Sequence, residues 1–367
     1  MKNNKRKIGF VIGGLTSGGA ERVISTLSND LIEKFEITII TLTKSKPFYP
    51  LDERIKVISC SDKSKKPKSF LESVQLNYKL ARQISKITKE EKIEVLIGFI
   101  TSANVLTVIA SKITGIPAII SERNNPKVEY VPKFWRVLRH FLYPRANTLV
   151  LQTKGVKALY EKRISPKKLV ILPNPISREL TALKKDLEQK NREKIILTVG
   201  RLHFQKRQDM IIRAFAKLNT KGWKLLIVGY GEERKELEDL IEQNKLTDKI
   251  EIISKVKNIH EYYNKSSIFV LSSRNEGFPN ALLEAMHFGL ATISTDCEFG
   301  PADIIENGEN GFLIDVDGRE ELIDRLAELM DDETLRQKFS RNAVESTRKY
   351  VAKNVVNQWE QLIKSHL

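Results

Sequence analysis

Residues 268–295 read IFVLSSRNEGFPNALLEAMHFGLATIST, and this stretch decides the fold of the chain. Runs rich in apolar and β-branched residues at 268–272 and 291–295 have the length of strands. Between them, Gly277-Phe278-Pro279 predicts a turn, and the residues from Asn280 onward predict a helix. Strand, helix and strand in this order predict two parallel strands joined by a helical crossover.

The same unit recurs along the chain in both directions. The predicted strands of the first half are 8–12, 37–42, 95–100, 118–121, 148–151 and 169–172. Those of the second half are 195–200, 224–229, 250–253, 268–272 and 291–295. Because the series restarts once, and because 367 residues exceed the size of one hydrophobic core, we expect an α/β protein with two domains.

The domain boundary is expected where two prolines open a charged stretch at 173–194. We therefore assign 1–175 to an N-terminal domain and 176–350 to a C-terminal domain. Residues 351–367 form a final helix with Val355, Val356, Trp359 and Leu362 on one face. That face needs an apolar surface on which to dock.

Composition excludes several classes of protein. Apolar runs such as 95–100 fall far short of the roughly 20 residues that cross a bilayer. The basic start, MKNNKRKIGFVIGGL, loses its apolar run at Gly13-Gly14 without a cleavage site, so we predict no signal peptide and a cytoplasmic location. Cys60 and Cys297 lack cysteine or histidine neighbours, which argues against disulfides, structural zinc and redox motifs.

Positive charge is concentrated in one half of the chain. Residues 1–185 contain 35 Lys and Arg against 15 Asp and Glu, whereas residues 186–367 contain 27 against 31. Such a field attracts an anionic membrane surface or a polyanion such as nucleic acid. A compositional bias of the organism would affect both halves, so we favour a functional origin. No nucleic-acid-binding module is present, and we predict no nucleic-acid partner.

Glycine-rich turns follow predicted strands at three places. GGLTSGGAER, 13–22, contains Gly14, Gly18 and Gly19 and could bring backbone amides to a phosphate, although it matches neither standard phosphate fingerprint. The second turn, GRLHFQKRQD at 200–209, contains Arg201 and Lys206, whose charges could clamp a diphosphate. VGYGEERKEL, 228–237, contains Gly229 and Gly231 and is the third.

The opening stretch contains two glutamates at suggestive positions. Glu276 lies on the loop before the predicted helix, and Glu284 lies about one turn into it, where its carboxylate could reach vicinal hydroxyls. The backbone amides of Asn280, Ala281 and Leu282 should point in front of the helix. A surface or helix-dipole role for Glu284 is the alternative that a lone glutamate pair favours.

Together, GGLTSGGAE, VGRLHFQK, VGYGEERKEL and RNEGFPNALLEAMHFGLATISTDCEFGPADIIENGENGFLI resemble family-4 retaining glycosyltransferases of the GT-B fold. The resemblance spans nearly the whole chain. It implies two facing Rossmann-like domains with an interdomain cleft, and hexosyltransferase activity. ISERNNP and KFWRVLRHFLYPRA resemble bacterial enzymes that add N-acetylgalactosamine to undecaprenyl-diphosphate-linked oligosaccharides, which implies a role in glycan, O-antigen or capsule biosynthesis.

The resemblance also implies roles for individual residues. Arg201 and Lys206 match the pair that holds the donor diphosphate, Glu276 matches the contact with the donor sugar, and Glu284 matches the ribose ligand. Asn280, Ala281 and Leu282 match amides above the phosphate and sugar, and Gly14 matches a glycine that closes over the diphosphate. Gly18, Gly19, Gly229, Gly231 and Val256 complete the expected donor site. The last helix is expected to cross back to the N-terminal domain.

This sequence departs from the family pattern at two positions. Arg123, after Glu122, stands where several relatives have a histidine near the donor sugar. It either takes over a polar contact or adapts the site to another sugar or acceptor. Ser254 stands where the strand before the base-binding loop usually ends in glycine.

Asp315-Val316-Asp317 is a D-x-D string of the kind that binds a metal-nucleotide complex in the other glycosyltransferase fold. Its position before a helix starting near Gly318 predicts a helix N-cap instead. We therefore expect neither a metal nor another cofactor, with cationic side chains and helix N-termini neutralising the leaving diphosphate.

A basic and aromatic segment at 131–145 suits an interfacial helix. Trp135, Arg136 and Arg139, with Glu122 and Arg123, are the expected acceptor and membrane residues. A second segment of this kind spans 63–86. The alternative is that their apolar residues belong to a core and their charges are solvated.

The sequence thus predicts a peripheral enzyme on the inner face of the membrane that moves a sugar from a UDP-sugar to a lipid-linked saccharide. Two other functions stay open: a nucleotide-sugar 2-epimerase of the same fold, and a non-catalytic saccharide-binding protein at the membrane surface.

Overall fold

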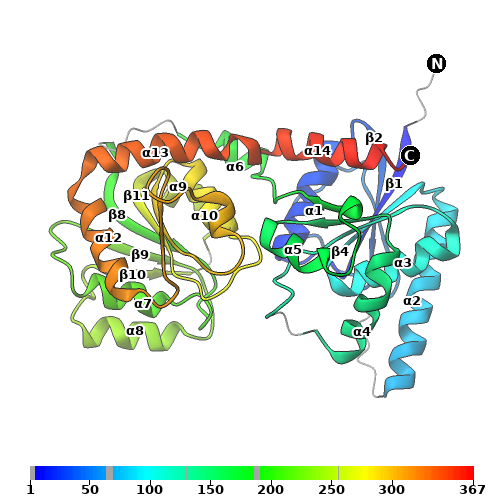
Figure 1. Ribbon diagram of the computed structural model, residues 1–367, viewed down its shortest axis with the longest axis horizontal. Coiled ribbons are helices and arrows are strands. Elements are labelled where there is room, and N and C mark those ends of the chain that lie inside the picture. The colour runs from blue at the N-terminus through cyan, green and yellow to red at the C-terminus, as the bar shows by residue number, and fades with distance from the viewer. Residues whose placement is uncertain (1–4, 63–68, 129–130, 186–190, 255) are drawn as a thin grey trace. The chain divides into compact units, whose positions relative to one another are not determined.

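The computed structural model describes residues 5–62, 69–128, 131–185, 191–254 and 256–367. The chain divides into two compact units (Figure 1). Met1–Pro175 and Ala352–Leu367 form the N-terminal unit, and Ile176–Val351 forms the C-terminal unit. Parts of two predicted segments, 63–68 of the second basic segment and 186–190 of the charged connection, lie outside the described residues.

The described part of the N-terminal unit contains one parallel sheet of seven strands in the order β3-β2-β1-β4-β5-β6-β7. Its strands are β1 (Arg6–Ile12), β2 (Phe35–Thr41), β3 (Lys56–Ser59), β4 (Val95–Phe99), β5 (Ala118–Ser121), β6 (Thr148–Leu151) and β7 (Leu169–Ile171). Its helices are α1 (Gly19–Leu31), α2 (Phe70–Glu90), α3 (Thr101–Thr114), α4 (Lys133–Leu142), α5 (Lys154–Glu161) and α14 (Ala352–Lys364). Short 3-10 turns follow α4 at Tyr143–Arg145 and precede β7 at Pro166–Lys168.

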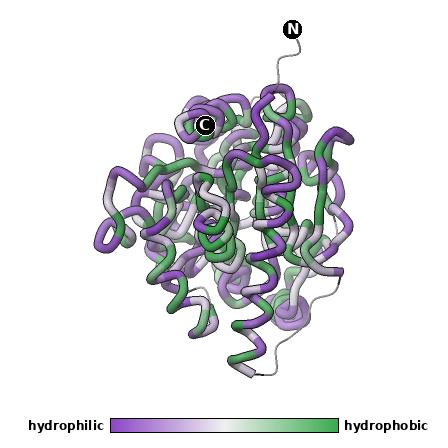
Figure 2. Tube along the Cα trace, turned by 90° about the vertical axis from the view of Figure 1, so that its right-hand side faces the viewer, coloured by the Kyte–Doolittle hydropathy of each residue, from purple (hydrophilic) through white to green (hydrophobic). Residues whose placement is uncertain are grey.

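Helices cover both faces of this sheet, which is why its inner strands are apolar throughout. On one face, α1 and α14 pack on β1, β2 and β4 through a core that includes Val355, Val356 and Trp359. On the other face, α2 and α3 pack on the same strands. In Figure 2 the central strands are green, whereas turns and outward faces of helices are purple.

Six parallel strands form the sheet in the described part of the C-terminal unit, in the order β10-β9-β8-β11-β12-β13. The strands are β8 (Glu193–Val199), β9 (Lys224–Val228), β10 (Ile250–Ile253), β11 (Ser266–Leu271), β12 (Ala291–Thr295) and β13 (Phe312–Ile314). The helices are α6 (Arg178–Ala182), α7 (Gln208–Phe215), α8 (Arg234–Gln243), α9 (Ile259–Lys265), α10 (Asn280–His287), α11 (Pro301–Ile304), α12 (Arg319–Asp331) and α13 (Glu333–Thr347), with a 3-10 turn at Arg348–Tyr350.

Two hydrophobic cores lie on opposite faces of this second sheet. One contains residues of α7, α8 and α12, and the other contains residues of α9 and α10. Counted within the unit, the strand order is 3-2-1-4-5-6, the doubly wound order of dinucleotide-binding folds. Ligands of such sheets bind beyond the carboxyl ends of the strands, where the order reverses between strands 1 and 4. In this unit those strands are β8 and β11.

The structure confirms the α/β class and the two parallel sheets, and it adds two strands to the predicted series, β3 and β13. β3 is a short edge strand whose residues are exposed or half-buried. An edge strand lacks the continuous apolar run by which the other strands were recognised.

Candidate functional site

Two loops meet beyond the carboxyl ends of β8 and β11 in the C-terminal unit. The loop after β8, 200–207, leads into α7, and the loop after β11, 272–279, leads into α10. Ser272 donates from its hydroxyl to the carbonyls of Lys206, at 2.7 Å, and Arg207, at 2.9 Å. The amide of Arg274 donates to the carbonyl of Gln205 at 2.8 Å. The two loops are therefore fixed to each other at the point where the fold favours a ligand.

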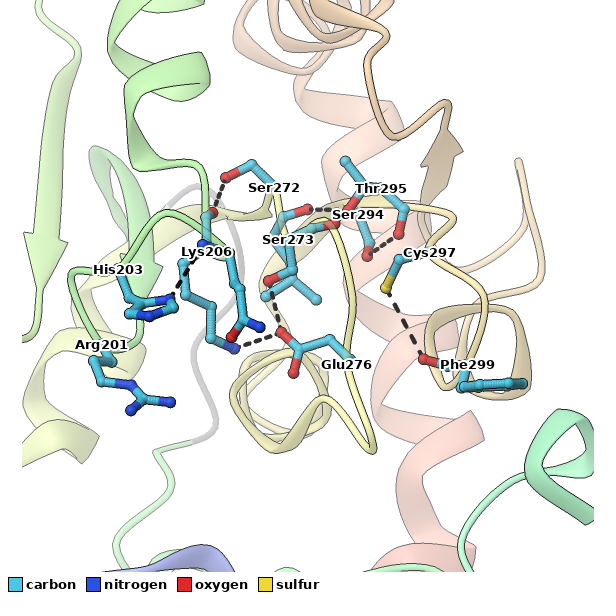
Figure 3. A network of polar contacts seen from close by, with 12 residues as sticks. Arg201, His203, Lys206, Ser272, Ser273, Glu276, Ser294, Thr295, Cys297 and Phe299 are labelled. Carbon is cyan, nitrogen blue, oxygen red and sulfur yellow. Dashed lines mark hydrogen bonds and ion pairs between the residues drawn. The ribbon is translucent and has the colours of Figure 1, made fainter. Parts of the chain in front are cut away.

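Lys206 and Glu276 form an ion pair across these loops (Figure 3). The Lys206 ammonium lies 2.5 Å from Oε1 of Glu276, and the hydroxyl of Ser273 donates to the same oxygen at 2.6 Å. The side chain of Lys206 is 25% exposed and that of Glu276 is 10% exposed, so the pair is largely shielded from water. Thr295 in turn donates to the carbonyl of Ser273 at 2.6 Å. This network holds one cation and one carboxylate in fixed positions.

Arg201 lies on the same loop but is exposed and forms no part of this ion pair. Its carbonyl accepts a hydrogen bond of 3.1 Å from Nε2 of Gln208. This bond fixes the backbone of the turn. In Figure 3 its guanidinium points to the same side of the loop as the Lys206–Glu276 pair. Both cations belong to the loop between β8 and α7.

Cys297 lies close to this pair and was not singled out from the sequence. Burial, with Glu276 as the second cause, raises the pKa of the Cys297 thiol to about 12. A thiol with that pKa is protonated at neutral pH and is a poor nucleophile.

Gly229 and Gly231 bring the loop after β9 against the loop after β8. A Cβ atom on Gly229 would lie 1.8 Å from the carbonyl oxygen of Gly200, and one on Gly231 would lie 2.0 Å from that of Leu202. Neither approach is possible for a residue with a side chain. Both glycines, predicted as donor contacts, have this steric role in the structure.

Ser254, directly after β10, joins the same group of loops. Its hydroxyl donates to the carbonyl of Gly229 at 3.2 Å and accepts a hydrogen bond from the guanidinium of Arg234. Val256, two residues later, packs half-buried against the core beside α9 and α10. The serine therefore fastens the loop after β10 to the loop after β9.

The helix α10 begins at Asn280, as predicted, directly after Pro279. The amide of Asn280 donates to the carbonyl of Phe278 at 3.0 Å, across a turn centred on Pro279. The expectation that the Asn280 amide is available in front of the helix is therefore wrong, because this amide is hydrogen-bonded within the loop. The amides of Ala281 and Leu282 lie in the first turn, where a helix supplies no acceptor of its own.

Glu284 is buried on α10, with 5% of its surface exposed. Its Oε2 accepts a hydrogen bond from the hydroxyl of Tyr263, on α9, at 3.1 Å. The carboxylate is therefore oriented by a neighbouring helix, which a residue with only a surface or helix-dipole role would not need. Tyr263 could not be predicted as a partner of Glu284, because the contact joins two helices.

The D-x-D string has a different role from the predicted N-cap. The helix α12 begins after Gly318, and no side chain caps it. Asp317 instead forms an ion pair with Arg207. Arg207 directly precedes α7 and has a left-handed backbone conformation, with φ +52°. Among the described residues, no group of three or more His, Cys, Asp or Glu side chains could hold a metal ion.

In the N-terminal unit, the glycine-rich loop after β1 is held by the segment that follows β2. The hydroxyl of Ser45 accepts from the amide of Leu15 at 2.7 Å, and a Cβ on Gly14 would meet that hydroxyl at 3.1 Å. Gly18 directly precedes α1, and a Cβ there would lie 2.1 Å from the carboxylate of Glu21. Gly19 is the first residue of that 13-residue helix, so the glycine-rich loop leads directly into α1.

Glu122, at the carboxyl end of β5, is buried with 1% exposure. Its Oε2 accepts hydrogen bonds from the hydroxyls of Tyr143, at 2.9 Å, and Tyr160, at 3.4 Å. Arg139 on α4 approaches the same oxygen at 3.9 Å. Burial and the adjacent Glu122 carboxylate hold the pKa of Tyr143 well above its usual value. The carboxylate thus orders the side chains of α4, the following turn and α5.

Arg123 is buried beside Glu122, with 7% exposure. Its guanidinium lies over the rings of Phe99, at 4.9 Å, and Trp359, at 5.6 Å, and donates to Oδ1 of Asn174 at 2.7 Å. Nε and Nη2 find no acceptor among the described residues. Burial lowers the pKa of Arg123 to about 9, against the opposite effect of Glu122. Arg123 therefore connects the end of β5 with α14.

The helix α4 carries the predicted interfacial residues, and none of its side chains is fully buried. Trp135 packs half-buried on the core under α2 and α3, Arg136 is exposed, and Arg139 turns inward to Glu122. Among the described helices, none is long and apolar enough to cross a membrane.

Comparison with known proteins adds to this geometry. Residues 17–180 match the family model described as Glycosyltransferase Family 4, and residues 181–346 match that of Glycosyl transferases group 1. Two relatives are N-acetylgalactosaminyltransferases of Campylobacter jejuni. One, named for a GalNAc-GalNAc-diNAcBac-PP-undecaprenol substrate, is 30% identical over 97% of this chain and 98% of its own. The other, named for an N-acetylgalactosamine-N,N'-diacetylbacillosaminyl-diphospho-undecaprenol substrate, is 32% identical over 92% and 94%.

Among solved structures, the Anabaena protein HepE in complex with UDP superposes with a TM-score of 0.80. The match covers 98% of this chain and 100% of that one at 17% identity, which shows a shared GT-B fold. With relatives at 30% identity or more over nearly the full length, the chain belongs to the family-4 and group-1 glycosyltransferases of the GT-B fold.

Proposed function

We propose that this glycosyltransferase transfers N-acetylgalactosamine from UDP-N-acetylgalactosamine to a saccharide carried on a polyprenyl diphosphate, with retention of the anomeric configuration. The relatives named for such acceptors support the substrate class. The observation that carries the proposal is the Lys206–Glu276 pair with Ser273, placed at the reversal of strand order in the C-terminal unit. A nucleotide sugar needs a cation for its diphosphate and an acceptor of hydrogen bonds for its sugar at such a place.

In this proposal the C-terminal unit holds the donor. Arg201 and Lys206 bind the diphosphate, and the amides of Ala281 and Leu282 add donors at the start of α10. The carboxylate of Glu284, oriented by Tyr263, accepts from the ribose hydroxyls. Glu276 contacts the sugar.

Transfer then depends on charge and position more than on a protein nucleophile. The acceptor hydroxyl attacks C1 of the sugar on the face of the departing diphosphate, and its proton passes to that diphosphate as the bond to C1 breaks. Lys206 and Arg201 stabilise the negative charge that develops on the leaving group. No metal takes part in this scheme.

A donor screen tests the function. We expect the thermal stability of the protein to rise selectively with UDP-N-acetylgalactosamine, over UDP-N-acetylglucosamine, UDP-galactose, UDP-glucose and GDP-mannose, because binding to the native state stabilises it. The same donor should support transfer to a lipid-linked saccharide, equally with and without EDTA. Conversion of the UDP-sugar without any acceptor would indicate an epimerase, and binding without turnover would indicate a saccharide-binding protein.

Replacing Glu284 tests the ribose assignment. We expect Glu284→Ala to weaken UDP binding by about 10- to 100-fold, since hydrogen bonds to a charged group contribute about 1.5–3 kcal/mol. Isothermal titration with UDP measures this change. Tyr263→Phe is the companion variant, because it removes the hydroxyl that orients Glu284 and should give a smaller loss. Unchanged UDP affinity in Glu284→Ala would contradict the assignment.

Membrane attachment through the N-terminal unit is a second part of the proposal. Exposed apolar side chains occur on α2 and α4, both of which pack against α3: Leu71, Val74, Tyr78, Val137 and Phe141. Exposed cations accompany them, including Lys133 and Arg136 on α4. Apolar side chains with a basic rim suit the anionic inner face of the membrane.

Charge reversal on α4 tests this attachment. Each basic side chain near an anionic surface contributes on the order of 1 kcal/mol, so Lys133→Glu with Arg136→Glu should reduce binding to phosphatidylglycerol vesicles at least tenfold. Co-sedimentation measures it, and Lys217→Glu with Lys221→Glu, at exposed positions of the C-terminal unit, is the matched control. Equal vesicle binding by both double variants would contradict the membrane-binding role of α4.

A further inference from the structure

A cavity of about 550 Å³ opens between α4 and α5 in the N-terminal unit. This volume lies within the range of roughly 300–1,000 Å³ that is typical of small-molecule sites. Arg136 and Arg139, predicted as acceptor or membrane residues, belong to its lining, whereas no local sequence pattern predicts a cavity.

The charges around the cavity have one sign. Its described lining residues include five cations and no carboxylate; the cations are Lys127, Arg136, Arg139, Lys162 and Arg163. Nη1 of Arg163 lies 3.0 Å from Nδ1 of His140. This contact joins the segment after α5 to α4. Such a lining favours a ligand with more than one negative charge.

The walls are apolar as well as basic. Val137 and Phe141 line the cavity from α4, and each exposes about half of its side chain, 47% and 58%. Leu159 of α5 and Ile164 complete this wall. A free nucleotide or an inorganic anion would leave these apolar groups without a partner. An amphiphile with an anionic head would cover them.

The floor of the cavity is fixed before any ligand binds. Tyr143 and Tyr160 line it, with ring centroids 6.0 Å apart and planes inclined by 22°. Both hydroxyls donate to the buried carboxylate of Glu122, which also faces Arg139. A site whose lining is held in place loses little entropy on binding.

We propose that this cavity binds the diphosphate end of the lipid-linked acceptor. Arg136, Lys162 and Arg163 contact the phosphates, and Val137 and Phe141 contact the first isoprene units of the lipid. Glu122 is a positioning residue that holds the tyrosine floor and Arg139. This inference rests on the proposed function, which it extends by naming the part of the acceptor that the N-terminal unit recognises.

Titration with farnesyl diphosphate, a short lipid diphosphate, tests the proposal on the full-length protein. We expect farnesyl diphosphate to bind at least tenfold more tightly than inorganic pyrophosphate, because only the former reaches the apolar wall. Equal affinity for the two probes would overturn the lipid part of the proposal. A soluble short-chain phosphatidylglycerol, which has one phosphate and forms no bilayer at the concentration used, should not compete with farnesyl diphosphate, and full competition would identify a general phospholipid site instead.

Two variants separate the cavity from the rest of the unit. Lys162→Glu with Arg163→Glu should weaken farnesyl diphosphate binding at least tenfold. Val137→Ser with Phe141→Ser, at exposed positions that the fold tolerates, should weaken it while leaving pyrophosphate binding unchanged. The matched control, Lys112→Glu with Lys353→Glu, makes the same charge change at exposed positions outside the lining. Wild-type affinity in both cavity variants would overturn the proposal.

The outcome is independent of the donor assays. If the wild-type enzyme transfers sugar while the cavity variants bind farnesyl diphosphate normally, the proposed function stands and the cavity proposal fails. If no UDP-sugar supports transfer, yet farnesyl diphosphate binding is lost in the cavity variants, the proposed function fails and the lipid-diphosphate site stands.

Discussion

Lys206→Ala is expected to lower kcat for sugar transfer by about 10²- to 10³-fold, the loss typical of removing one preorganised donor from a developing negative charge. Lys206 is the shielded cation of the site, fixed by Glu276 and by the hydrogen bonds of Ser272 to its loop. A charge held in this way needs no reorganisation when the leaving diphosphate forms. Steady-state transfer at saturating donor and acceptor measures the effect.

Loss of activity must be distinguished from loss of structure. Removing Lys206 leaves Glu276 with the hydroxyl of Ser273, so the loop keeps one of its two contacts to that carboxylate. We therefore expect a change of only a few degrees in the melting temperature. Lys217→Ala, at an exposed position of the same unit, should keep the wild-type rate. A near-wild-type kcat in Lys206→Ala would contradict the proposal that Lys206 stabilises the leaving diphosphate.

Local sequence patterns predicted much of the fold. The strands β1, β5 and β12 lie where the sequence placed them, because strands covered on both faces are rich in apolar and β-branched residues. Asn280 begins α10 because Pro279 is compatible with a helix start and the preceding glycine with a turn. In contrast, the edge strand β3 has no such signal, since half of its environment is solvent.

The site was predicted in part only. The resemblance to family-4 glycosyltransferases placed Lys206 and Glu276 at one donor site, which agrees with the convergence of loops after parallel strands at one edge of a sheet. Their direct ion pair could not be predicted, because it depends on the tertiary fit of two loops. The same reason explains the ion pair of Asp317 with Arg207, which is 110 residues away, and the hydrogen bonds of Tyr143 and Tyr160 to Glu122.

Trp359→Ala is expected to destabilise the N-terminal unit by about 3–5 kcal/mol, the usual cost of removing a buried tryptophan. Trp359 has no exposed surface, and its ring stacks on Phe99 at 5.8 Å and lies under the guanidinium of Arg123. Without the indole, α14 loses its largest contact with the sheet and Arg123 loses one of its two aromatic faces. Hydrogen exchange in peptides of β1 and β4 measures the effect separately from the C-terminal unit.

The predicted loss comes from packing, and two variants test that cause. The indole Nε1–H finds no acceptor among the described residues, so Trp359→Phe removes a buried polar group while it keeps an aromatic ring. It should cost less than half as much as Trp359→Ala. Gln358→Ala, at the exposed neighbour on α14, should leave exchange unchanged. If Trp359→Ala exchanged like the wild type in β1 and β4, α14 would be dispensable for the N-terminal core, and the burial of Arg123 would need another support.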